Sequence, residues 1–186
     1  MELKDQNNPE LPINPYAVND GITHINMKTF GQTEVGRLLS MEAPNRFTHP
    51  VFGSFDSLEG FWYYIRSGCQ DTKVRTSNEG YGRRRFGNQP TEKIENFQEI
   101  IGEGIYIMLC QLPDDRLQLI LDNELPLDMY YIHYGKDESG KVVSAIVQRQ
   151  RHHQWYLPLV EKVIQLIRDD KPYPEVDYGK LLQQAQ

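Results

Sequence analysis

The residues best suited to chemistry lie in one short segment, which runs from Ser57 to Arg66 and reads SLEGFWYYIR. Glu59 falls in the first turn of a predicted helix, and Arg66 lies about two turns further on, on the same face. Consecutive aromatic residues between them supply ring faces and phenol hydroxyl groups. A partly buried carboxylate beside aromatic walls can stabilise an oxocarbenium ion or activate water at an anomeric carbon. The same walls can stack a nucleobase.

The flanking residues predict that this segment is a short, buried helix. Asp56 or Ser57 can cap its start, because a short oxygen side chain accepts from the free N–H groups of the first turn. Gly68 can end it, since glycine suits the left-handed position after a helix. A simpler interpretation stays open, in which the rings are core and Glu59 only complements the helix N-terminus. The predicted apolar face consists of Leu58, Phe61, Trp62 and Ile65.

A basic patch between residues 73 and 85 is a second candidate, because clustered cations can hold phosphates. A solvated surface loop is the alternative interpretation. The patch stands out in an acidic chain with a net charge of −6, and that total does not favour nucleic acid as a general partner. Its cations are Lys73, Arg75, Arg83, Arg84 and Arg85, against the single acid Glu79.

Other motifs point away from metals and common cofactors. The sequence has no dinucleotide-binding GxGxxG after a strand, no P-loop, no HExxH and no GxSxG. His152 and His153 are adjacent on a predicted helix, so they point in different directions and are not expected to share a metal. Cys69 and Cys110 have no metal-ligand spacing, and Cys110 is expected in the core. We therefore expect no metal and no cofactor.

The length and patterning predict one compact α+β domain, mostly helical, with a small sheet that includes a β-hairpin in the C-terminal half. Residues 1–20 read as an extended arm, 21–170 as the main domain and 171–186 as a tail. No apolar run is long enough for a membrane span and no secretory signal is present, so a reducing cytoplasm is expected. The predicted strands are 22–27, 129–134 and 142–147, and the further helices are 34–41, 91–109, 113–121 and 150–169.

The segment LEGFWYYIRS also resembles the motif of the NADAR family, the YbiA-like N-glycosidases. That motif reads approximately [ST]-x-E-x-[YF]-[FWY]-x-x-x-K-F, and Ser57, Glu59, Phe61 and Trp62 match it. Weaker similarity continues through residues 97–121, 131–135 and the last predicted helix, so that the resemblance covers about residues 22–169.

This resemblance implies a mixed α+β fold and hydrolysis of an N-glycosidic bond on a phosphate-bearing ribose. The family's substrates include ADP-ribose on guanine, also in nucleic acid, and amino-pyrimidine intermediates of riboflavin synthesis. Some phage-encoded members are thought to remove ADP-ribose that host defence toxins place on DNA, and this sequence has the look of a small phage-type protein. The catalytic residues so implied are Glu59 and Arg66, and the substrate-binding residues are Arg37, Trp62, Tyr63, Arg84 and His133.

One departure from the family motif leaves the activity open. The family lysine that is proposed to capture the ribose aldehyde aligns with Arg66, and a guanidinium group stays protonated and does not readily form a Schiff base. Either Glu59 acts with water, or another residue such as Lys73 substitutes, or the domain binds without cleaving. If the domain cleaves, the expected partner is a nucleotide-like small molecule or ADP-ribosylated nucleic acid. If it binds without cleaving, the expected partner is a nucleotide or a host protein that the domain inhibits.

Overall fold

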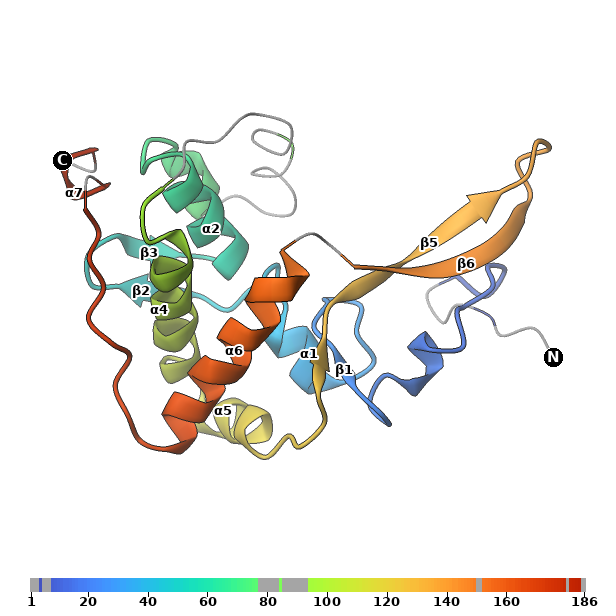
Figure 1. Ribbon diagram of the computed structural model, residues 1–186, viewed down its shortest axis with the longest axis horizontal. Helices are drawn as coiled ribbons and strands as arrows, with labels where there is room; N and C mark the ends of the chain where they lie inside the picture. Colours follow the sequence, from blue (N-terminus) through green and yellow to red (C-terminus); the bar gives the residue numbers. More distant parts are fainter. Residues whose placement is uncertain are drawn as a thin grey trace. The chain divides into compact units, whose positions relative to one another are not determined.

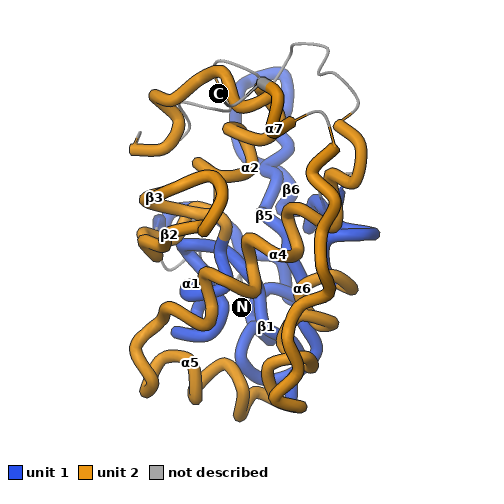
Figure 2. The backbone as a smooth tube through the Cα atoms, turned by 90° about the vertical axis from the view of Figure 1, so that its left-hand side faces the viewer, with its two compact units in different colours: residues 1–40, 124–157 blue, residues 41–123, 158–186 orange. Residues whose placement is uncertain are grey.

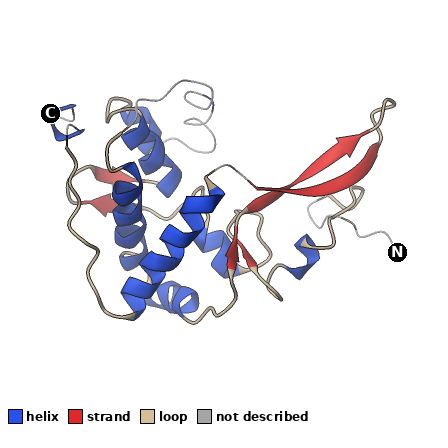
Figure 3. Ribbon diagram, viewed as in Figure 1, coloured by secondary structure: helices blue, strands red, loops and turns tan. Residues whose placement is uncertain are grey.

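The protein has an α+β architecture, with more residues in helices than in strands (Figures 1 and 3). The computed structural model describes residues 4, 8–76, 84, 94–149, 152–179 and 181–184. The predicted fold class and the hairpin in the C-terminal half are confirmed. The chain divides into two compact units (Figure 2): unit 1 comprises residues 1–40 and 124–157, and unit 2 comprises residues 41–123 and 158–186.

Unit 1 is built on a short parallel pair of strands. β1 (Ile25–Asn26) pairs with β4 (Leu127–Asp128), and helix α1 (Glu34–Leu39) packs beside β1. The predicted strand over residues 22–27 is confirmed only at its end. Residues 21–23 instead continue the turn after the 3₁₀ helix η1 (Ala17–Asn19), because the amides of Ile22 and Thr23 both donate to the Asn19 carbonyl.

The hairpin is the other main feature of unit 1. β5 (Tyr130–Lys136) pairs antiparallel with β6 (Val142–Arg149), close to the predicted bounds. Asp137 closes the turn, because its carboxylate accepts from the amides of Ser139 and Lys141. Tyr130, Ile132 and Tyr134 share one face of β5, and His133 lies on the other face, opposite Ile146.

Unit 2 surrounds the predicted aromatic helix, α2 (Leu58–Arg66). Of the two predicted cap residues, Asp56 and Ser57, it is Ser57 that caps the helix, since its hydroxyl oxygen accepts from the Gly60 amide. Gly68 follows the helix with a φ of +66°. The predicted apolar face is buried. Around α2 lie β2 (Phe47–His49), β3 (Gly53–Phe55), the 3₁₀ helix η2 (Thr72–Arg75) and α4 (Phe97–Cys110), and the unit also contains α5 (Asp114–Leu121) and α7 (Leu181–Gln184).

Two glycines let α4 pack closely inside unit 2. A methyl group on Gly104 would overlap the Phe61 ring, and one on Gly102 would overlap the Tyr173 hydroxyl group and the Leu159 side chain. The sequence suggests close packing of these glycines against another backbone. The structure instead shows them packed against side chains.

Helix α4 corrects two expectations. It begins at Phe97 and not at Thr91, because residues 94–96 are not helical and Asn96 has a left-handed φ of +55°. Thr91 itself lies outside the described residues. Cys110 is exposed and not buried, because it stands at the last position of α4, off the apolar stripe that ends with Met108 and Leu109.

The last long helix, α6 (His153–Arg168), has nearly the predicted bounds, and the division between the units falls inside it at Pro158. Its buried residues are Tyr156, Leu157, Val160, Val163 and Ile164, whereas Trp155 is only half-buried. After α6 the chain runs without regular structure along α4. The Tyr106 hydroxyl donates to the Lys171 carbonyl, and Asn96 donates to the Asp177 carbonyl.

Candidate functional site

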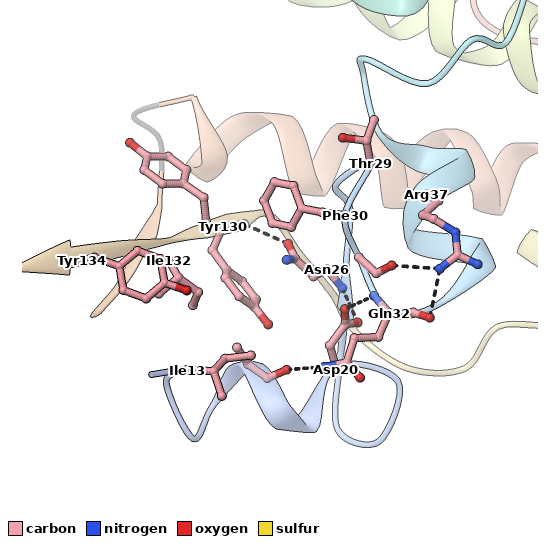
Figure 4. Close-up of a pocket in the computed structure, with 13 residues that line it drawn as sticks. Ile13, Asp20, Asn26, Thr29, Phe30, Gln32, Arg37, Tyr130, Ile132 and Tyr134 are labelled. Carbon is pink, nitrogen blue, oxygen red and sulfur yellow. Dashed lines mark hydrogen bonds between the residues drawn. The ribbon is translucent and has the colours of Figure 1, made fainter. Parts of the chain in front are cut away.

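A pocket of about 780 Å³ lies wholly within unit 1, and Figure 4 shows it in close-up. We call it the unit 1 pocket. Its walls come from the N-terminal segment, from the loop that leads into α1 and from strand β5. The lining residues are Ile13, Ala17, Asp20, Asn26, Thr29, Phe30, Gly31, Gln32, Arg37, Tyr130, Tyr131, Ile132 and Tyr134.

Strand β5 supplies the aromatic end of the pocket. Because side chains alternate along a strand, Tyr130, Ile132 and Tyr134 all reach the same face. His133 lies on the opposite face and is not among the lining residues, although Tyr131 on that face does line the pocket. The resemblance implies that His133 binds substrate, but His133 does not line this pocket. Its neighbours Ile132 and Tyr134 do.

Asp20 places a carboxylate in the wall of the pocket. The side chain is 6% exposed, and its two oxygens accept from the amides of Asn26 (2.9 Å) and Gln32 (2.7 Å). Within the described part of the chain, Asp20 forms no ion pair. A buried carboxylate without a counter-ion retains unused acceptor capacity, since each oxygen has more than one acceptor position.

Asn26 lies beside Asp20 and is 3% exposed. Its Oδ1 accepts from the Tyr130 amide at 3.1 Å, so the Nδ2 group must point the other way. No described residue accepts a hydrogen bond from that Nδ2 group. Gly31 and Gly36 approach the Asn26 backbone closely, because a methyl group on either glycine would overlap the Asn26 carbonyl oxygen.

Arg37 forms the cationic end of the pocket. It lies on α1, whose start is capped by the Thr33 hydroxyl accepting from the Gly36 amide. One guanidinium nitrogen donates to the carbonyls of Gly31 (2.9 Å) and Gln32 (3.0 Å), as Figure 4 shows. The side chain is exposed, and its other N–H groups can therefore bind an anion.

A polar network fastens the N-terminal wall of the pocket to the rest of unit 1. The Tyr16 hydroxyl donates to Asp128 at 3.0 Å, and Asn14 donates to the Ala145 carbonyl at 2.9 Å. Arg149 and His153 bind the same Asp128 carboxylate. Burial opposes ionisation of Asp128, but these hydrogen bonds outweigh it and lower its pKa to about 2.

His24 and Tyr130 form a second contact behind the pocket. The His24 ring stacks on Tyr16 with 4.2 Å between centroids, and its Nε2 is 2.9 Å from the Tyr130 hydroxyl oxygen. Burial lowers the pKa of His24 and raises the pKa of Tyr130. Both groups are therefore held in their neutral forms, and they hold the Tyr130 ring against the pocket by a neutral hydrogen bond.

The residues expected to catalyse lie in unit 2, on α2. Glu59, Tyr63 and Arg66 are its half-exposed positions, and their spacing places them along one stripe of the helix. We call them the α2 stripe. Trp62 is not part of it: its side chain is buried and its ring meets Phe97 edge-on at 5.0 Å between centroids.

The basic patch is only partly described. Arg75 packs against the core of unit 2, because its guanidinium group lies 4.0 Å from the Tyr64 ring centroid and donates to the Phe52 carbonyl. Lys73 and Arg84 are exposed. Arg83 and Arg85 lie outside the described residues.

Unit 2 also holds a buried histidine that the sequence does not single out. His49 Nδ1 accepts from the amides of Val51 and Phe52, which leaves the proton on Nε2 to be donated to Glu103 at 3.1 Å. The Tyr178 hydroxyl donates to the same Glu103 oxygen. Since both ring nitrogens of His49 are engaged, this cluster holds the C-terminal segment and offers no base.

Among the residues that the structure describes, no group of three or more His, Cys, Asp or Glu side chains could hold a metal ion. No helix in these described segments has the length and apolar character needed to cross a bilayer.

Comparison with protein-family models, with curated proteins and with solved structures found no match for this chain. The resemblance to the NADAR family, with the activity and residue roles that it implies, therefore stays a prediction.

Proposed function

We propose that this chain binds a nucleotide-like small molecule in the unit 1 pocket. The observation that carries the proposal is the distribution of chemistry along the pocket, with aromatic rings on β5 at one end and Arg37 at the other (Figure 4). Aromatic rings stack flat heterocycles, and a guanidinium group binds phosphate oxygens. The volume of about 780 Å³ lies inside the range of about 300–1,000 Å³ that is typical of small-molecule sites.

The binding proposal is tested by calorimetric titration with ADP-ribose, AMP and adenosine. We expect AMP and ADP-ribose to bind, and Arg37→Ala to weaken them about tenfold or more, because a hydrogen bond to a charged group is worth about 1.5–3 kcal/mol. Adenosine has no phosphate, so its affinity is expected to be the same in both proteins.

The matched control is Arg46→Ala, which removes an arginine that is exposed and pairs with Asp56 in unit 2. It is expected to leave all three affinities unchanged. Absence of binding by the folded wild-type protein would refute the proposal, and so would an equal loss of adenosine and AMP binding in Arg37→Ala.

A second candidate is hydrolysis of an N-glycosidic bond by the α2 stripe, for instance removal of ADP-ribose from guanine. The observation that favours it is the shared exposure of Glu59 and Arg66 on one side of α2. Water would add to C1′ of the ribose while the C1′–N bond breaks, and the base nitrogen would keep the electron pair and take up a proton. Glu59 would stabilise the positive charge at C1′ or accept the proton of the attacking water.

This second candidate is tested by chromatography of ADP-ribosylated guanosine after incubation with the protein. We expect release of the free base or of ADP-ribose by the wild type, and its loss in Glu59→Gln but not in Glu161→Gln, which alters an exposed residue of α6. If the folded protein shows no turnover, the hydrolysis proposal fails and only the binding proposal remains. Such an activity would counteract a toxin that attaches ADP-ribose to guanine. We propose that the protein acts in the cytoplasm, because both cysteines are free thiols.

A further inference from the structure

We infer that Asp20 and Asn26 bind the two neighbouring hydroxyl groups of the ligand's ribose, so that the unit 1 pocket selects ribonucleotides over 2′-deoxyribonucleotides. This inference rests on the proposed binding function and names the part of the ligand that determines its specificity.

The first argument is the unused hydrogen-bonding capacity of these two buried side chains. Asp20 accepts only from two backbone amides, and the Asn26 Nδ2 group donates to no described residue. Both residues line the pocket, so a ligand that fills it can hydrogen-bond to them.

The second argument is the pairing of an acceptor with a donor. A cationic ligand group at this position would satisfy Asp20, but it would leave the Asn26 donor unpaired. An anionic group at this position would be repelled by Asp20. A pair of neighbouring hydroxyl groups satisfies both residues, because each hydroxyl can donate and accept. One hydroxyl donates to the Asp20 carboxylate while the other accepts from Asn26.

The third argument is rigidity. The Asn26 amide donates to Asp20 and its Oδ1 accepts from the Tyr130 amide, so the backbone of β1 and β5 fixes the orientation of the side chain. Gly31 and Gly36 pack closely against the Asn26 carbonyl, where a methyl group on either glycine would overlap it. A donor and an acceptor held in place in this way discriminate between ligands more sharply than mobile ones do, because little ordering is needed on binding.

The fourth argument is the position of the pair. In Figure 4, Asp20 and Asn26 lie between Tyr134 and Ile132 on one side and Arg37 on the other. A nucleotide has the same order of groups, with the sugar between the base and the phosphate. The pair therefore lies where the ribose of a bound nucleotide would be.

The inference is tested by titrating the wild-type protein with AMP, 2′-deoxy-AMP and 3′-deoxy-AMP. We expect each missing hydroxyl to weaken binding about tenfold to a hundredfold, because a hydrogen bond to a buried charged or amide partner is lost. Equal affinities for the three ligands would overturn the inference and leave the proposed binding function standing. Absence of binding by all three would overturn both.

Two variants show whether Asp20 and Asn26 are the cause. Asn26→Asp keeps the oxygen that accepts from Tyr130 and replaces the donor, and Asp20→Asn removes the charge with little change in volume. In each folded variant, as judged by circular dichroism, we expect AMP to lose its advantage over one of the two deoxy analogues, and over a different one in each variant, because each residue binds a different hydroxyl group. A preference for AMP over both deoxy analogues that persists in both variants would overturn the assignment. The assignment would also fail if GMP and CMP showed no preference over their deoxy analogues, because the preference would then depend on the base.

Discussion

At the residue scale, Asp128 shows how one buried carboxylate holds several segments of unit 1 together. It accepts hydrogen bonds from Tyr16 of the N-terminal segment, Arg149 of β6 and His153 of α6. The same Tyr16 ring stacks on His24 behind the unit 1 pocket. The wall of the pocket thus depends on a charge that lies outside the pocket.

The lowered pKa of Asp128 makes a prediction about acid stability. The pKa is about 2 in the folded protein, against an ordinary value of 3.8, so ionised Asp128 favours folding above about pH 4. This contribution of about 2 kcal/mol is lost as the pH falls from about 4 toward 2. Urea unfolding of the wild type should show that loss, and Asp128→Asn should lack it while being less stable at pH 7.

The control for this prediction is Glu161→Gln, which changes an exposed carboxylate of α6. It is expected to keep the wild-type dependence of the free energy of unfolding between pH 4 and pH 2. If Asp128→Asn shows the same dependence as the wild type, the Asp128 network is not formed as described.

At the scale of elements, the packing of α2 against α4 depends on Gly104. Gly104→Ala raises helix propensity by about 1 kcal/mol but places a methyl group against the buried Phe61 ring, and overpacking costs about 1–3 kcal/mol. We expect a lower melting temperature for Gly104→Ala. In the Phe61→Leu background, where the ring is gone, the same change should cost much less.

That comparison separates packing from propensity. A higher melting temperature for Gly104→Ala in the wild-type background would mean that propensity dominates and that the Phe61 ring does not lie against α4 as described.

The start of α2 supports a second prediction at this scale. The Ser57 hydroxyl accepts from the Gly60 amide, so Ser57→Ala should reduce the free energy of unfolding by about 1 kcal/mol. Ser57→Asp keeps an acceptor at the cap and should retain most of that stability. Equal stability of Ser57→Ala and the wild type in chemical denaturation would show that the cap contributes nothing.

Elements whose signals are local were the ones that the sequence could predict. The cap, the apolar face and the end of α2 depend on residues within one segment, and so do the hairpin strands. The start of α4 was predicted wrongly because Asn96 adopts a left-handed conformation that helical periodicity does not encode. Cys110 was misplaced because an apolar residue at a helix end can fall outside the buried stripe.

At the scale of the whole molecule, the sequence could not reveal the unit 1 pocket, because its residues come from segments far apart in the chain. Asp20 and Asn26 meet Tyr130 only when β1 pairs with β4. No local spacing marks that meeting. Of the residues that the sequence singles out, Arg37 lines this pocket, while Glu59, Tyr63 and Arg66 share a stripe of α2 in unit 2.

This separation gives the two proposed activities separate tests. Substitutions at Arg37 or Asp20 should change binding in unit 1, and Glu59→Gln should change only turnover. Each unit can therefore be assessed by its own readout, binding or turnover, in the same 186-residue chain.

The central claim, that the unit 1 pocket binds a nucleotide-like ligand, is tested most directly by titrating the isotopically labelled 186-residue chain with ADP-ribose and recording amide chemical shifts by NMR. The predicted result is saturable change at Asp20, Asn26, Gln32 and the amides of β5. Absence of change, or change confined to residues 57–66 of α2, would contradict the claim.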